Sequence, residues 1–235
     1  MIGIWLRKII TTRRRRKAPR ILAAACLSAW GVSCSSLHQS TKEEAFKSKF
    51  GDYTYCEIEA VRQTSQKSCG LACLAAVLRY WDRPASEPEL ARSHPLKAGI
   101  GYPMQQLQAI AVGHGLLAFA VSMAQTGDKP AAALAEHLAR GRPVIVAIHC
   151  PQGRYFGEPV PIIESLDRRT WRPLGIGTTF KHHYVVVIGE NATNYLVMDP
   201  AYGIGSVRKQ SLLDWWRGES YAALICSPPP AIGSG

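Results

Sequence analysis

The sequence predicts an α+β fold, because helical patterns occupy the first part of the domain and strand patterns dominate the rest. After Cys69, the apolar residues Leu71, Leu74 and Leu78 recur at i, i+3 and i+7, the spacing of a helix face. From residue 183 onward, β-branched runs are separated by turn residues, which is typical of antiparallel strands. Helices and strands segregated in this way indicate an α+β domain with one core.

The boundaries of the elements follow from breaker residues. The helix that begins at Cys69 is expected to stop before Pro84, because proline cannot continue a helix. A second helix is expected to start at Met104 and to end at Gly113. The further elements are expected, in chain order, as a helix at 87–93, a strand at 116–122, a helix at 131–140, a strand at 144–148, a strand after His183, a turn at 189–194 and an antiparallel strand at 195–198.

Cys69 stands where a nucleophilic thiol is expected. It follows a polar loop that contains Gln63 and it opens a helix. The unpaired N–H groups and the partial positive charge of a helix N-terminus stabilise a thiolate and lower the pKa of the cysteine. The alternative is a buried structural cysteine, because free cysteines are among the most buried residue types.

His183 and Asp199 are the candidate base and orienting group. His183 starts one strand of a predicted hairpin and Asp199 ends the other, so the two side chains are expected to lie side by side and to form a hydrogen bond. His182 faces the opposite side of the sheet, which favours a loop residue over a base. Alternatively, Asp199 before Pro200 only ends a strand at a turn.

These segments resemble the bacteriocin-processing cysteine peptidases, which are papain-like domains that cut double-glycine leader peptides and are often fused to ABC exporters. The resemblance covers residues 56–227. It rests on a glutamine six residues before the cysteine, the string Cys-Gly-Leu-Ala-Cys-Leu at 69–74, the string His-Tyr-Val-Val at 183–186, Asp-Pro at 199–200, and the sixteen-residue spacing between the histidine and the aspartate.

The resemblance implies a papain-like fold in which the helix with Cys69 packs on an antiparallel sheet with His183 and Asp199. It makes Cys69 the nucleophile, His183 the base, Asp199 the orienting carboxylate and Gln63 the oxyanion donor. The expected activity is that of a cysteine endopeptidase on polypeptide substrates, with a double-glycine preference, a separate exporter as partner and no cofactor. Two alternatives stay open, namely a non-catalytic peptide-binding module and an acyl transferase or amidase with the same triad.

Residues 1–33 are expected to be a signal peptide. They contain eight basic residues and no acidic one, then an apolar stretch at 21–32 that is too short to span a bilayer. Ser33-Cys34 resembles the end of a bacterial lipobox, although Gly31 stands where leucine is preferred, so Cys34 is the expected lipidation site. The alternative is ordinary cleavage nearby, with Cys34 lost or free. The expected location is the periplasmic side of the envelope, at the outer membrane rather than the inner one.

The net charge of +11 does not indicate a nucleic-acid partner. The eight basic residues of the signal leave only +3 on the remaining chain, and no basic stripe with interleaved aromatic residues follows. Nucleic acid is therefore not an expected partner. The expected membrane contact is the lipid anchor.

The remaining cysteines and histidines raise the question of disulfides and metals. Export allows disulfides among Cys56, Cys73, Cys150 and Cys226, and a Cys150–Cys226 bridge is favoured because both residues end expected strands. No metal site is predicted, because no Cys-x-x-Cys pair exists and the neighbouring His182 and His183 face opposite ways. The residues of ligand type that do not fit a zinc site are Cys69, Cys73, His149, Cys150, His182 and His183.

The mature chain is expected to contain a tether at 34–55, the peptidase domain at 56–227 and a flexible tail at 228–235. Residues 150–181 form a long segment, rich in proline, glycine and arginine, that leads directly to His183. A loop of this size beside a site is expected to act as a substrate-facing flap. A disordered insertion is the alternative.

Overall fold

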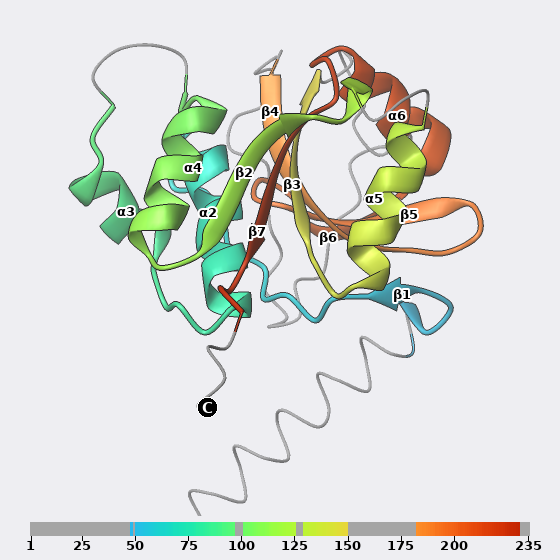
Figure 1. Cartoon of the computed structure of the whole chain (residues 1–235), viewed down its shortest axis with the longest axis horizontal. Helices are drawn as coiled ribbons and strands as arrows, with labels where there is room; N and C mark the ends of the chain where they lie inside the picture. The colour runs from blue at the N-terminus through green and yellow to red at the C-terminus, as the bar shows by residue number, and fades with distance from the viewer. Residues whose placement is uncertain (1–47, 49, 97–100, 126–128, 150–181, 231–235) are drawn as a thin grey trace, which may run out of the picture. The chain divides into compact units, whose positions relative to one another are not determined.

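The structure is a computed structural model of the chain, and it describes residues 48, 50–96, 101–125, 129–149 and 182–230 (Figure 1). The chain divides into two compact units, residues 1–43 and 44–235. All described residues lie in the second unit. Cys34, Cys150, the signal peptide and the expected flap at 150–181 therefore lie outside the described residues.

The α+β prediction is confirmed. The helices are α2 (Cys69–Tyr80), α3 (Glu87–Ser93), α4 (Met104–Gly113), the 3-10 turn η1 (Met123–Gln125), α5 (Pro130–Ala139) and α6 (Lys209–Arg217). The strands are β1 (Thr54–Tyr55), β2 (Leu117–Ser122), β3 (Val144–His149), β4 (His182–Glu190), β5 (Asn194–Asp199), β6 (Gly203–Arg208) and β7 (Ala222–Ser227).

The strands form one antiparallel sheet in the order β2-β7-β3-β4-β5-β6, and β1 pairs with the end of β4. The predicted hairpin of β4 and β5 is present, with Val186 opposite Met198 and a bulge between Val187 and Gly189. A Cβ atom at Gly189 would lie only 2.5 Å from the carbonyl oxygen of Thr54. Glycine is therefore required where β1 packs against β4.

Helices cover both faces of the sheet, with α2, α3 and α4 on one side and α5 and α6 on the other (Figure 1). Successive residues of β4 alternate between the two cores, as the period of a strand requires. Val186 and Ile188 pack in the core of α2 and α4, whereas Val185 and Val187 pack in the core of α5 and α6.

Helix α2 is more deeply buried than a one-faced helix pattern predicts. Every residue from Cys69 to Leu78 is buried, because the helix is enclosed by α3, α4 and β4. Small side chains such as Ala72, Ala75 and Ala76 let these neighbours approach on all sides. The nucleophile candidate is thus carried by a central helix with little freedom to move.

Some features differ from the sequence expectations. Phe50 is buried in the core and Thr54–Tyr55 joins the sheet, although the sequence predicts a tether at these residues. Strand β6 and helix α6 were not predicted, since β6 contains Gly203 and Gly205, which are rare in strands, and α6 has no side-chain cap.

The favoured Cys150–Cys226 disulfide stays a prediction, because Cys150 lies outside the described residues. Its expected partner Cys226 is buried on β7, opposite Ala118 of β2. Cys56, Cys73 and Cys226 carry free thiols in the structure.

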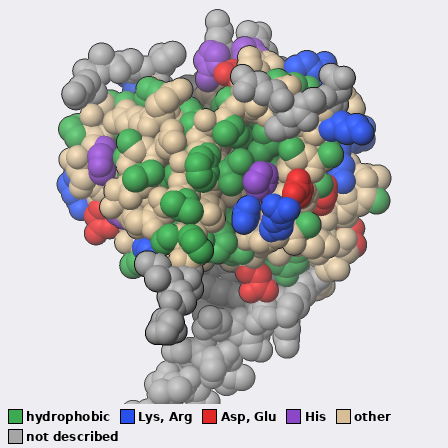
Figure 2. Space-filling view, viewed as in Figure 1, with side chains coloured by type: hydrophobic (Ala, Val, Ile, Leu, Met, Phe, Trp, Pro, Cys, Tyr) green, Lys and Arg blue, Asp and Glu red, His purple; other side chains and the backbone are tan. Residues whose placement is uncertain are grey.

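Of the four large apolar side chains that are exposed among the described residues, three lie on the edge strand β2 and one, Val112, lies on α4. Leu117, Phe119 and Val121 alternate along β2 and are 42%, 55% and 37% exposed, and apolar side chains are visible over this face in Figure 2. Within the part of the chain that the structure describes, no helix is long and apolar enough to cross a bilayer.

Candidate active site

The loop before α2 presents Cys69 at the first turn of the helix, as predicted. Ser65 and Ser68 close this loop, because the Ser65 N–H donates to the Ser68 hydroxyl at 3.1 Å and that hydroxyl donates to the Ser65 carbonyl at 3.1 Å. The first intrahelical bond runs from the Ala72 N–H to the Ser68 carbonyl. The N–H groups of the residues between them therefore have no intrahelical acceptor.

Gly70 allows the start of α2 to approach the sheet closely. A Cβ atom at this position would lie 2.9 Å from the Leu107 side chain and 3.1 Å from the ring of Tyr184. Tyr184 directly follows His183 on β4, so the absence of a side chain at Gly70 brings the helix start to the strand that carries the histidine.

His183 and Asp199 form the hydrogen bond that the hairpin geometry predicts. The Nε2 atom of His183 lies 3.1 Å from Oδ1 and 3.2 Å from Oδ2 of Asp199, and both side chains are buried. The backbone N–H groups of Ala201 and Tyr202 donate to the same carboxylate at 2.6 and 3.1 Å. These donors fix the carboxylate, which in turn fixes the plane of the imidazole.

Cys69 and His183 interact electrostatically, and each changes the pKa of the other. Burial alone would raise the pKa of the Cys69 thiol, but the hydrogen bond and charge of His183, with backbone hydrogen bonds from Tyr184 and Gly70, lower it. Burial alone would lower the pKa of His183, but the charge and hydrogen bond of Asp199, with the Cys69 hydrogen bond, raise it. Both shifts favour a thiolate beside an imidazolium.

The other described cysteines behave as structural residues. Burial raises the pKa of Cys56 and of Cys73, and it raises the pKa of Cys226 to about 12. Cys73 lies one turn after Cys69, and its thiol donates to the Tyr184 carbonyl at 3.3 Å. Cys69 is therefore the described cysteine whose pKa is lowered.

Gln63 is buried beside the turn that follows Asp199. Its backbone N–H donates to the Pro200 carbonyl at 3.0 Å, and its side-chain Nε2 donates to the Ser65 carbonyl at 2.8 Å. A glutamine amide has two N–H donors, so the Ser65 contact leaves one for another acceptor. The loop between β1 and α2 is thus tied both to the Asp199 turn and to its own Ser65.

Thr64 and Glu87 hold this loop in place, and sequence reasoning missed both. The Thr64 hydroxyl donates to the Glu87 carboxylate at 2.8 and 3.0 Å, and Glu87 is 1% exposed at the start of α3. A buried carboxylate needs such a donor. The only sequence signal is an acidic residue in the first turn of a helix, which is common without any role in a site.

Comparisons with known proteins bear on the family and the fold of the chain. The family model described as the Peptidase_C39 like family matches residues 55–223. No curated protein matches the sequence. Among solved structures, a Bacillus anthracis protein described provisionally as a C39-like peptidase has a TM-score of 0.52 at 15% identity, covering 74% of this chain and 96% of its own.

Two further solved structures are similar at a TM-score of 0.48 and 19% identity. One is a double-glycine motif protease from an AMS/PCAT transporter in complex with the leader peptide, covering 74% of this chain and 94% of its own. The other is the peptidase domain of Streptococcus ComA, a bifunctional ABC transporter, covering 73% and 98%. With the family model matched over most of the domain, the chain belongs to the C39-like peptidase family and has a papain-like fold.

Proposed function

We propose that the protein is a cysteine peptidase in which Cys69 is the nucleophile, His183 the general base and Asp199 the orienting carboxylate. The observation that carries this proposal is the series of side chains Cys69, His183 and Asp199, in which His183 is hydrogen-bonded to Asp199 and lowers the pKa of Cys69 at the start of a buried helix. The same series in a member of the C39-like peptidase family supports peptide-bond hydrolysis as the reaction.

The reaction begins with the transfer of the Cys69 proton to His183. Because Nε2 of the imidazole faces Asp199, the other ring nitrogen, Nδ1, accepts that proton. The sulfur then attacks the carbonyl carbon of the scissile peptide bond, and the carbonyl oxygen becomes an oxyanion. The imidazolium donates its proton to the leaving amine, and water hydrolyses the resulting thioester with His183 as base.

Gln63 and the Cys69 backbone N–H are the proposed oxyanion donors. The N–H of Cys69 lies in the first helical turn, and Gln63 keeps one amide N–H beyond its bond to Ser65. Fixed donors of this kind stabilise the negative charge that develops in the transition state. The loss of one donor typically lowers turnover by about a hundredfold to a thousandfold.

The proposed substrate is a polypeptide with a double-glycine cleavage site. The sequence resemblance at 69–74 and 183–186 to double-glycine leader peptidases supports this choice. A separate exporter that handles the same polypeptide is the proposed partner. The leader peptidases that the sequence resembles are often fused to ABC exporters, so substrate and exporter are expected to occur together.

The proposed location is the periplasmic side of the bacterial envelope, with attachment through a lipid on Cys34. Support comes from the basic residues, the short apolar stretch and the Ser33-Cys34 pair of the first 34 residues. Ser35, rather than aspartate, follows the cysteine, which favours the outer membrane.

The function is tested by incubating the full chain with peptides that contain or lack an internal Gly-Gly and by identifying new termini by mass spectrometry. We expect the parent to hydrolyse the peptides that contain Gly-Gly, and Cys69→Ala to hydrolyse none. The control Cys226→Ala, which removes a buried thiol at the opposite end of the sheet, should act as the parent does. Products joined to an added amine instead of water would assign acyl transfer. Cleavage by Cys69→Ala would contradict the proposal.

A further inference from the structure

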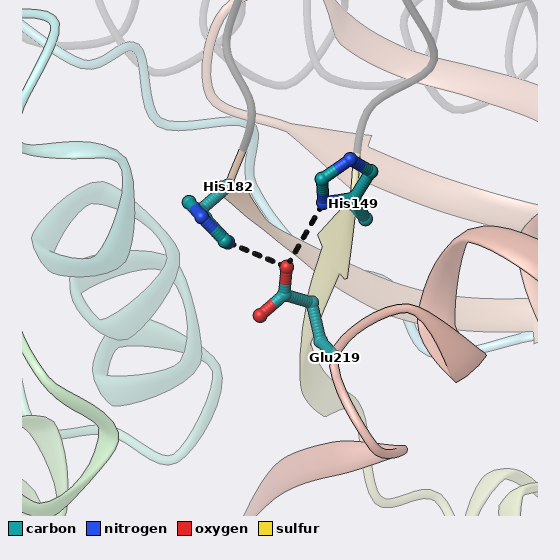
Figure 3. Close-up of side chains that lie close together, drawn as sticks. All are labelled: His149, His182 and Glu219. Carbon is teal, nitrogen blue, oxygen red and sulfur yellow. Dashed lines mark hydrogen bonds and ion pairs between the residues drawn. The ribbon is translucent and has the colours of Figure 1, made fainter.

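A second cluster of polar side chains lies on the opposite side of β4 from His183. His149 ends β3, His182 begins β4, and the two residues are direct partners across the antiparallel pair. Glu219 reaches the same point from the turn between α6 and β7 (Figure 3). We propose that His149, His182 and Glu219 form a binding site for a divalent transition-metal ion of the zinc class.

The distances suit such a site. The three potential ligand atoms lie within 4.8 Å of one another. Glu219 Oε1 lies 3.5 Å from Nδ1 of His149 and 2.6 Å from Nδ1 of His182. Zinc bonds of about 2.0 to 2.1 Å in a tetrahedral arrangement separate the ligand atoms by about 3.3 Å. The contact to His149 already has this length, and the contact to His182 lengthens when a metal ion replaces the shared proton.

The orientation of the two rings brings their nitrogens to one oxygen. The ring centroids are 5.6 Å apart and the ring planes are inclined by 84°, so the imidazoles do not stack. In Figure 3 both rings point toward the Glu219 carboxylate. This convergence on a single carboxylate oxygen is what a shared ion requires.

The backbone around Glu219 is shaped for this close approach. A Cβ atom at Gly218 would lie 2.7 Å from Cβ of His149, so glycine is needed where the turn meets β3. Ser220 and Tyr221 both adopt left-handed conformations, with φ of 53° and 55°. The Ser122 hydroxyl donates to the Ser220 carbonyl at 2.6 Å and stabilises this turn. Glu219 is thereby held over the two histidines.

The ligand chemistry selects the class of ion. Two imidazole nitrogens and one carboxylate oxygen suit zinc and related transition metals, whereas magnesium and calcium prefer oxygen ligands throughout. The side chains of His149, His182 and Glu219 are 50%, 60% and 19% exposed, so an ion can enter and a fourth position stays open to solvent. A bound ion would tie β3, β4 and the α6–β7 turn together.

In the sequence, His149 and His182 stand near only cysteines and His183 as possible ligands, and these spacings predict no metal site. Glu219 lies 37 residues after His182, and no spacing rule connects the two. The carboxylate joins the histidines through the tertiary structure alone.

The proposal is tested with the full chain carrying Cys69→Ala, which removes the nucleophilic thiol as a competing ligand. The protein is freed of metal with a chelator and titrated with Co²⁺, whose visible absorption reports coordination, and then with Zn²⁺ in competition. We expect one ion per chain. His149→Gln, His182→Gln and Glu219→Gln should each weaken binding at least tenfold, whereas the control His114→Gln should bind as the parent does.

Folding is monitored separately by the melting temperature of each metal-free variant. The expected result is a metal-dependent rise in melting temperature for the parent and for His114→Gln, and a smaller rise for the three ligand variants. Unchanged affinity in both His149→Gln and Glu219→Gln, the absence of Co²⁺ absorption, or a strong thiolate-to-cobalt band would overturn the proposal. In the first two cases, the cluster is a hydrogen-bonded ion pair only.

Discussion

The Nε2 atom of His183 lies 3.1 Å from the Oδ1 atom of Asp199, and neither side chain reaches solvent. This contact joins the start of β4 to the end of β5. It leaves Nδ1 as the ring nitrogen that can take up the Cys69 proton. The reactivity expected of the site depends on this one orientation of the ring.

Iodoacetamide is expected to label Cys69 faster than Cys56, Cys73 or Cys226 near neutral pH. Iodoacetamide reacts with the thiolate form of a cysteine. Burial opposes a lower pKa at Cys69, but His183 outweighs it and lowers the pKa, whereas burial raises the pKa of the other three cysteines. Labelling rates are measured by mass spectrometry of the peptides. Equal rates at Cys69 and Cys73 would argue against an activated nucleophile.

His183→Ala is expected to lower turnover by about a thousandfold or more, because it removes both the base and the group that lowers the pKa of Cys69. The matched control is His114→Ala, a partly exposed histidine after α4. Steady-state hydrolysis and melting temperature are measured for both variants. Similar losses in the two variants, with both folded, would remove His183 from the mechanism.

Asp199→Asn is expected to retain more turnover than His183→Ala, because an amide oxygen still accepts a hydrogen bond from Nε2. The charge of Asp199 opposes the lowering by burial and raises the pKa of His183, so its loss lowers that pKa. The imidazolium then deprotonates at lower pH, so activity is lost at a lower pH on the alkaline side of the profile. The pH profile, recorded with a chelator present, checks this, and an unmoved alkaline limit contradicts it.

Gln63→Ala is expected to lower turnover by about a hundredfold to a thousandfold with little change in substrate binding, because an oxyanion donor acts mainly in the transition state. Gln108→Ala is the matched control, since the Gln108 amide also donates to a carbonyl, that of Ala118 at 2.9 Å, but from α4. Turnover number and KM are measured separately. A change in KM alone would place Gln63 in substrate recognition.

Lipid attachment at Cys34 is expected to hold the protein on membranes in high salt and to require detergent for release, because more than one acyl chain gives stable anchoring. Cys34→Ser should abolish this attachment. Mass spectrometry of the mature N-terminal peptide decides the question. An unmodified peptide that starts elsewhere, found in a soluble fraction, would indicate a free enzyme.

Local pattern was enough to place three parts of the candidate site. The apolar spacing after Cys69 set the helix start, and the β-branched run with its turn set the hairpin that joins His183 to Asp199. These features involve residues close in sequence, whose geometry follows from helix and strand periodicity. The motif resemblance added Gln63.

The contacts between distant segments were decided by the tertiary structure. The approach of α2 to β4 depends on Gly70 beside Leu107 and Tyr184, which only packing reveals. The burial of α2 on all sides and the addition of β1 to the sheet likewise depend on partners far along the chain. Sequence periodicity describes one element at a time, whereas Glu219 meets His149 and His182 only because the end of β3, the start of β4 and the α6–β7 turn lie together in the fold.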